Sequence, residues 1–298
     1  MRRLAICISL LLAIVAPAFG AQRKIAFERG DNVWIANLDG SDAKKIAAGS
    51  LPSISADATR LAFNTNKDSK TRPGPERHIA VAGLASGKVT IFKEIPSDNC
   101  FGPVWSPDGS KLAFSIMAEK EWQLGLVNAD GSGFRFVKNA ALKNDAFGAP
   151  EWARDGKSIF CHDLDNIYQI DLDGNVLKKW ELSTILTDAS MNGGDRLSVS
   201  PDGKVLLMDV DCGSEHERKN WDGPQPAIEK FDVASEKAVR VTGKDDFVWE
   251  PFWLSNEEFL CILQKENENE PSLYRMPLTG KNPKLLAKHA RTPSVSAP

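Results

Sequence analysis

The chain has 298 residues, of which 42% are hydrophobic and 26% are charged, and its formal net charge at pH 7 is −3. This slightly acidic balance provides no basic stripe for nucleic acid and no cationic surface for anionic lipid, so both classes of partner are excluded as leading candidates. The length allows either two average domains or one large β domain.

The first 20 residues have the pattern of a secretory signal peptide. Two arginines precede an apolar run, Leu4 to Val15, and small residues lead to a predicted cleavage ahead of Ala21. The run is shorter than the ~20 residues that a membrane-spanning helix needs, so a retained anchor is the less favoured alternative. We expect residues 21–298 to form one exported domain, periplasmic or secreted, with no stable membrane span.

One hairpin pattern recurs along the exported part of the chain and is clearest at Phe101 to Ser115. It has a first strand containing Trp105, a Ser-Pro-Asp-Gly turn and a second strand that begins near Leu112. The first strand recurs at Pro52–Ser55, Pro150–Ala153, Leu197–Ser200 and Pro251–Leu254. The period is roughly 42–54 residues, which is the range of propeller and solenoid repeats.

Two further strands follow each hairpin and are joined by a polar turn. In the third repeat they flank Asp130-Gly131, a good hairpin signal between apolar runs. Each repeat is therefore predicted to be a four-stranded antiparallel meander, which has the size of a propeller blade.

The two ends of the exported chain are predicted to share one blade. Lys24 to Phe27 matches a second strand, so the first blade lacks its first strand at this terminus. Thr292 to Ala297 reads like Leu51 to Ala56, which is a first strand. If the C-terminal strand completes the first blade, six blades close into a ring without an open edge.

The repeat sequence resembles that of a known family. Residues 103–115, Pro-Val-Trp-Ser-Pro-Asp-Gly-Ser-Lys-Leu-Ala-Phe-Ser, and residues 126–133, Leu-Val-Asn-Ala-Asp-Gly-Ser-Gly, resemble the repeat of the TolB-type six-bladed β-propeller. The resemblance covers essentially the whole exported chain and implies an all-β propeller of four-stranded blades. Related repeats occur in prolyl-oligopeptidase-like peptidases and in oligogalacturonate lyase. TolB itself carries an α/β domain before its propeller, which is not expected here because blade strands begin near Lys24.

Motifs for catalysis and metal binding are missing from the sequence. Neither Gly-x-Ser-x-Gly nor His-Glu-x-x-His occurs, and the four histidines, of which His162 is one, show no metal-ligand spacing. An acidic stretch that begins at Asp209 fits no cation loop and is predicted to be solvated. The sequence therefore favours a protein that is not an enzyme and has no metal or cofactor.

The repeat pattern separates two groups of tryptophans. Trp105, Trp152 and Trp253 share one repeat position with isoleucine and valine, so we expect them in the core between blades. Trp221 and Trp249 fall outside the repeat pattern and are candidates for ligand contact. Four cysteines remain after the leader, Cys100, Cys161, Cys212 and Cys261. Their even number allows disulfides, but Cys161 and Cys261 occupy equivalent repeat positions, which favours buried free thiols.

Blade topology predicts where a ligand would bind. One face of the ring, the tight-turn face, carries the Pro-Asp-Gly and Asp-Gly turns. The opposite, loop-rich face carries the connectors and two long second-to-third loops, Asn64 to Arg77 and Asp211 to Pro226. Loops on a rigid scaffold are common binding sites. The candidate ligand-binding residues on this face are Arg77, His78, Arg196, His216, Trp221, Trp249 and Glu250.

Two alternatives stay open for this face. Arg196 and Glu250 enter the first strands of neighbouring blades, where they would either pair with each other or meet a ligand. The leading functional hypothesis is a scaffold of the cell envelope that binds a protein or peptide. The alternative is a polyuronate or oligosaccharide binder or lyase, in which Arg72, Arg77 and His216 grip carboxylates and Trp221 stacks on a sugar ring.

Overall fold

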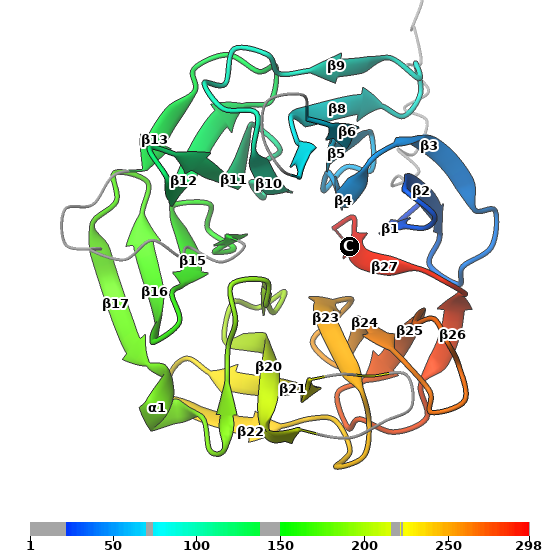
Figure 1. Cartoon of the computed structure of the whole chain (residues 1–298), viewed down its shortest axis with the longest axis vertical. Coiled ribbons are helices and arrows are strands. Elements are labelled where there is room, and N and C mark those ends of the chain that lie inside the picture. Colours follow the sequence, from blue (N-terminus) through cyan, green and yellow to red (C-terminus); the bar gives the residue numbers. More distant parts are fainter. Residues whose placement is uncertain (1–21, 70–73, 138–149, 216–220, 222, 298) are drawn as a thin grey trace, which may run out of the picture.

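The computed structural model describes residues 22–69, 74–137, 150–215, 221 and 223–297, and these form six blade sheets around a central axis (Figure 1). All pairings within the blades are antiparallel between neighbouring strands. The predicted all-β, six-bladed propeller is confirmed. Within the described residues, no helix has the length and apolar character needed to cross a bilayer.

The strands of each blade lie side by side and are named below in order from the central axis outward (Figure 1). Blade 1 contains β27 (Arg291–Val295), β1 (Lys24–Glu28), β2 (Asn32–Asn37) and β3 (Lys44–Ala48). Blade 2 contains β4 (Ser50–Ile54), β5 (Arg60–Asn64), β8 (Ile79–Gly83) and β9 (Val89–Ile91), with the small hairpin β6 (Lys67–Asp68) and β7 (Pro75–Glu76) between its second and third strands. Blade 3 contains β10 (Cys100–Trp105), β11 (Lys111–Ala118), β12 (Glu121–Asn128) and β13 (Arg135–Val137).

The other half of the ring follows the same plan. Blade 4 contains β14 (Glu151–Trp152), β15 (Ser158–His162), β16 (Asn166–Asp171) and β17 (Val176–Glu181), followed by α1 (Leu182–Ile185). Blade 5 contains β18 (Ala189–Ser190) and β19 (Leu197–Val199), which both pair with β20 (Val205–Glu215), then β21 (Pro224–Asp232) and β22 (Lys237–Arg240). Blade 6 contains β23 (Val248–Trp253), β24 (Glu258–Leu263), β25 (Ser272–Pro277) and β26 (Lys284–Ala287).

The C-terminal strand closes the ring, as the sequence predicts. β27 pairs antiparallel with β1 and places Val295 opposite Ile25 and Ser294 opposite Ala26. Blade 1 is thus built from both ends of the described chain (Figure 1). Because β27 supplies the inner strand of blade 1, the backbone groups of β1 have partners on both sides.

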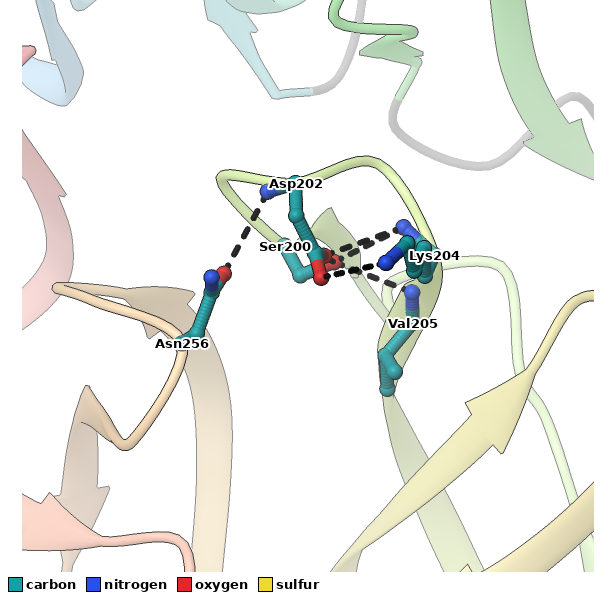
Figure 2. A network of polar contacts seen from close by, with 5 residues as sticks. All are labelled: Ser200, Asp202, Lys204, Val205 and Asn256. Atoms are coloured by element: carbon teal, nitrogen blue, oxygen red, sulfur yellow. Dashed lines mark hydrogen bonds and ion pairs between the residues drawn. The ribbon is translucent and has the colours of Figure 1, made fainter.

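The tight turns repeat one hydrogen-bonding arrangement. In blade 5, the Ser200 hydroxyl donates to Asp202 Oδ1 (2.7 Å) and accepts from the backbone N–H of Val205 (2.9 Å) (Figure 2). In blade 3, the Ser106 hydroxyl likewise donates to Asp108 Oδ1 (2.6 Å) and accepts from the backbone N–H of Lys111 (2.9 Å). These bonds hold the ionised carboxylate, so the Ser106 hydroxyl lowers the pKa of Asp108. The turn is therefore specified within a few residues of sequence.

The repeat tryptophans lie between blades, as predicted. Trp105, Trp152 and Trp253 are 8%, 3% and 3% exposed, respectively. Each indole N–H donates to a first-strand carbonyl of the preceding blade, at Ser53 (2.9 Å), Val104 (3.2 Å) and Ser198 (3.0 Å), in that order. The indoles thus combine apolar burial with a polar link across the blade interface.

Cys100, Cys161, Cys212 and Cys261 are free thiols in the structure. Cys161 and Cys261 are fully buried at equivalent positions in blades 4 and 6, which confirms the prediction from the repeat. Their burial raises the pKa of both thiols, so they remain protonated side chains of the apolar core.

Candidate functional site at the loop-rich mouth of the channel

The residues that enter the first strands surround the narrow part of the central channel. Leu51 and Gly102, each with the proline that follows it, and Arg196 with Leu197 line a cavity of about 30 Å³. At Leu51, Gly102, Glu250 and Thr292 the backbone φ is +53°, +63°, +52° and +50°, respectively. Strand register shifts near each of these residues, so each forms a bulge. Left-handed φ is unfavourable for a β-branched residue such as Thr292, so surrounding contacts must hold it.

Those contacts cross from blade to blade. The backbone N–H of each bulge residue donates to a side chain of the preceding blade. Leu51 N donates to Glu28 (3.3 Å), Gly102 N to Asn64 (2.9 Å), Glu250 N to Asp209 (3.0 Å) and Thr292 N to Glu250 (2.5 Å). We call this set of bonds the mouth staple. It supplies acceptors for amides that leave the strand ladder at the bulges.

The acceptors of the mouth staple come mostly from one repeat position of the second strand. By strand register this position holds Glu28, Asn64, Ser115, His162, Asp209 and Ile262 in blades 1 to 6. In blade 4, a ring nitrogen of His162 lies 3.0 Å from the Asp195 carbonyl of blade 5. In blade 6, where the position is the apolar Ile262, the Glu250 carboxylate binds Thr292 instead. Different side chains thus perform one structural task.

The carboxylates at the mouth are poorly solvated. Burial, together with the charge of Asp211, raises the pKa of Asp195 to about 7. Burial and the neighbouring Asp195 raise the pKa of Asp209 well above its usual value. Burial also raises the pKa of Glu28, against the lowering effect of the bond from Leu51. The mouth therefore concentrates carboxyl groups whose ionised forms are costly.

The expectation of a solvated acidic stretch is wrong for its first member. Asp209 lies within β20 and is 5% exposed, because the strand continues to Glu215. Pairing with β21 extends to Glu215 and Pro224, so both ends of the segment from Asp211 to Pro226 belong to strands. The other long segment, Asn64 to Arg77, likewise contains the β6–β7 hairpin.

Arg196 and Glu250 do not pair with each other in the part of the chain that the structure describes. Glu250 is half-buried and its carboxylate is engaged by Thr292. The half-buried Arg196 is close enough to lower the pKa values of Glu28 and Glu151, although burial outweighs this effect at both. Glu250 thus has a structural role, and Arg196 balances several buried carboxylates.

The predicted aromatic residues of blades 5 and 6 come together. The Trp221 and Trp249 rings lie 5.5 Å apart, and Trp221 also meets the edge of Phe247 at 5.4 Å. The Trp221 indole N–H donates to the Pro224 carbonyl (2.9 Å). Trp221 and Trp249 are half-exposed, so this cluster presents aromatic surface at the mouth.

A second aromatic cluster lies at blades 2 and 3. The Arg77 guanidinium lies over Phe101 (5.2 Å) and Trp122 (6.0 Å), and it donates to Asn99 Oδ1 (3.0 Å). Its neighbour His78 has a buried Nδ1 without a hydrogen-bond partner among the described residues. Arg77 and His78 therefore lie in a different sector from Trp221, Trp249 and Glu250. His216 lies outside the described residues.

Sequence reasoning overlooked the buried polar positions of the mouth. Glu28, Asp195 and His162 were not selected as site residues, because each lies in or beside an ordinary strand. Aligning the second strands of all six repeats would have revealed the recurring polar position. Within the described residues there is no group of three or more histidine, cysteine, aspartate or glutamate side chains that could hold a metal ion.

Comparisons with known proteins agree on the fold. No known family profile matches the chain. Tricorn protease homolog 1 of Streptomyces coelicolor is 33% identical over 100 residues, which is 32% of this chain but only 9% of that protein. The crystal structure of TolB from Acinetobacter baumannii superposes with a TM-score of 0.64 at 17% identity, covering 94% of this chain and 68% of TolB. The chain has the fold of a TolB-type propeller.

Propellers with other roles are also similar. A crystal structure of a nidogen/laminin complex contains a chain that superposes with a TM-score of 0.65 at 11% identity, covering 92% of this chain and 98% of that one. Oligogalacturonate lyase in complex with manganese superposes with a TM-score of 0.52 at 18% identity, covering 86% of this chain and 72% of the lyase. At these identities the likeness establishes the fold alone.

Proposed function

We propose that the protein is an exported, non-catalytic TolB-like propeller that serves as a scaffold in the cell envelope and binds a protein or peptide on its loop-rich face. The observation that carries this proposal is the set of half-exposed aromatic side chains, accompanied by arginines, around the channel mouth. Residues 1–20 would act as the export signal and residues 21–298 as the binding domain.

Three sectors of the mouth carry such aromatic side chains, and in two of them an arginine lies over the rings. Arg29 lies over Trp34 (4.1 Å) in blade 1, and Arg77 lies over Phe101 and Trp122 in blades 2 and 3. The third sector is the Trp221–Trp249 cluster. Tryptophan and arginine are enriched among the residues that dominate the binding energy of protein interfaces, and tryptophan buries a large area with few lost rotamers.

The polar groups of the mouth support a scaffold role. Glu28, Asp209 and Glu250 accept hydrogen bonds from backbone amides of the next blade, so their carboxylates hold the ring together. A partner would meet a rigid rim whose aromatic side chains are already positioned by these strands. Little ordering of the propeller would then oppose binding.

Affinity capture from an envelope extract tests this proposal. The immobilised protein is compared with the double variant Trp122→Ala, Trp249→Ala and with a control double variant, Leu177→Ala, Val239→Ala, in which two residues of the outermost strands, both 54% exposed, are shortened. We expect the mouth variant to weaken binding of the purified partner at least tenfold and the control to bind like the parent.

Two results would contradict the proposal. One is that no partner is recovered under conditions that retain weak complexes. The other is that the mouth variant binds the partner with full affinity. A rise in ultraviolet absorbance from an unsaturated product, on adding oligogalacturonate and Mn²⁺, would replace the proposal with the lyase alternative.

A further inference from the structure

A larger cavity opens at the opposite, tight-turn end of the channel. Its volume is about 340 Å³, within the lower range of small-ligand pockets. Aromatic side chains from three blades line it: Trp105, Trp152, Phe252 and Trp253. Glu151 lines both this cavity and the narrow part of the channel, so it lies where the two meet.

Glu151 occupies a repeat position where the fold uses serine. By strand register this position holds Ser53, Val104, Glu151, Ser198, Phe252 and Ser294. Each of the three serine hydroxyls accepts a hydrogen bond from a backbone N–H of the following blade, with Trp105 (3.4 Å), Trp253 (3.2 Å) and Ile54 (3.1 Å) as donors. In blade 4, Glu151 Oε1 accepts the corresponding bond from Val199 N at 3.4 Å.

This contact leaves much of the Glu151 carboxylate unused. Among the described residues, Glu151 makes no other hydrogen bond and no ion pair, although its side chain is only 7% exposed. Burial accordingly raises its pKa to about 7. A serine would make the structural bond without burying a charge, so the fold itself does not require a carboxylate here.

The arginines near this cavity are already engaged. Arg23 donates to the carbonyls of Ser296 (3.2 Å) and Leu254 (2.9 Å). Arg154 donates to the carbonyls of Ser200 (3.0 Å) and Val199. Both guanidinium groups therefore link neighbouring blades at the rim, and neither forms an ion pair with Glu151.

We propose that Glu151 is the anionic receptor for a primary ammonium group that enters the channel from the tight-turn face. The ligand is a lysine side chain of a polypeptide or a small aliphatic amine, with its methylenes against the aromatic wall. This site is separate from the loop-rich mouth and does not depend on the proposed function.

The geometry favours a compact cation. Beyond Glu151 the channel narrows to the cavity of about 30 Å³, which suits an ammonium better than the broad, planar guanidinium group. The half-buried Phe252 ring can also attract a cation through its π face. The two arginines at the rim, Arg23 and Arg154, disfavour a ligand with several positive charges.

Titration calorimetry and NMR of the full exported chain test this site with two probes, n-pentylamine and Nα-acetyl-lysine methylamide. The matched controls are the neutral Nε-acetylated lysine derivative and Nα-acetyl-arginine methylamide, which carries a guanidinium group and no primary amine. The variants are Glu151→Ser, which introduces the residue used in three other blades, and Glu151→Gln, which keeps the shape if the serine variant fails to fold.

We expect an amine probe to bind and to shift the indole N–H signals of Trp152 and Trp253, with at least tenfold weaker binding in either Glu151 variant. Binding of either probe supports the site. If only one probe binds, it shows whether the ammonium comes from a small aliphatic amine or from a lysine side chain. Binding of neither probe at 10 mM would overturn the proposal. So would equal binding by the Glu151 variants, or equal binding of the neutral derivative.

Discussion

Side-chain hydrogen bonds fix the backbone at both ends of the channel, but the bonds differ between the two ends. At the tight-turn end, serine and aspartate hold the turns of blades 2, 3 and 5 with hydroxyl-to-carboxylate bonds of 2.6, 2.6 and 2.7 Å. At the loop-rich end, side-chain oxygens of Glu28, Asn64 and Asp209 accept hydrogen bonds from backbone N–H groups of the next blade.

The difference comes from the range of the contacts. A turn bond joins residues two positions apart, so the same short sequence pattern reproduces it in blades 2, 3 and 5. A mouth-staple bond joins residues of neighbouring blades, up to 42 positions apart. Any acceptor of suitable reach serves there, so the residue type varies while the bond is kept. The four predictions below test this contrast.

The largest effect is expected from removing Thr292 to Pro298. This deletion removes β27 and with it the staple between Glu250 and Thr292, and it exposes the inner edge of β1. We expect a loss of several kcal/mol, comparable to the whole margin of a small domain, with aggregation. Urea denaturation measures the loss. A deletion of Ala297 and Pro298 alone, which leaves β27 complete, is the control. A melting temperature within a few degrees of the parent would contradict the role of β27 in closure.

Within one hairpin, the core residue should outweigh the turn residue. Trp105→Ala leaves a cavity between blades 2 and 3 and removes the bond to Ser53, so we expect a cost of about 3–5 kcal/mol. Asp108→Ala removes only local turn bonds and should cost about 1 kcal/mol. Equal, small losses of unfolding free energy for the two variants in denaturant titrations would show that the Trp105 indole does not stabilise the blade interface.

The buried Glu151 should make stability depend on pH. Its pKa is raised from 4.5 to about 7, so between these values the folded protein holds a proton that the unfolded chain has released. Stability therefore falls as pH rises through this window and is level above it. Glu151→Gln should remove about 3 kcal/mol of this dependence and stabilise the protein at pH 8. Parallel pH profiles of the parent and the variant would contradict the burial of the charge.

A pair of substitutions at Asp209 tests whether the mouth staple needs an acceptor or a charge. Asp209→Asn keeps an oxygen for the Glu250 amide, as Asn64 does for Gly102, and should be neutral or stabilising at pH 8. Asp209→Leu leaves that buried amide without a partner and should cost about 1–3 kcal/mol. Similar unfolding free energies for the two variants would show that the bond does not matter.

Sequence reasoning identified the blades because their signals are local. Strand alternation, the Ser-Pro-Asp-Gly turn and the match between Thr292–Ala297 and Leu51–Ala56 predicted the number of blades and their closure. The same reasoning placed Trp105, Trp152 and Trp253 in the core from their shared repeat position. The sequence predicted site residues in connectors and long loops. In the structure Trp221 and Trp249 lie together, but Arg77 and His78 lie in another sector of the mouth.

The sequence by itself determined the architecture, because each blade repeats bonds that form within a short stretch of chain. Only the tertiary structure decided the polar chemistry of the channel, because that chemistry depends on which side chains meet across blades. Glu250 becomes a structural acceptor since Ile262 provides none, and Asp209 is buried since β20 continues past it. Glu151 stands out only when the first strands are aligned around the axis, where it replaces a serine and places a charge inside the channel.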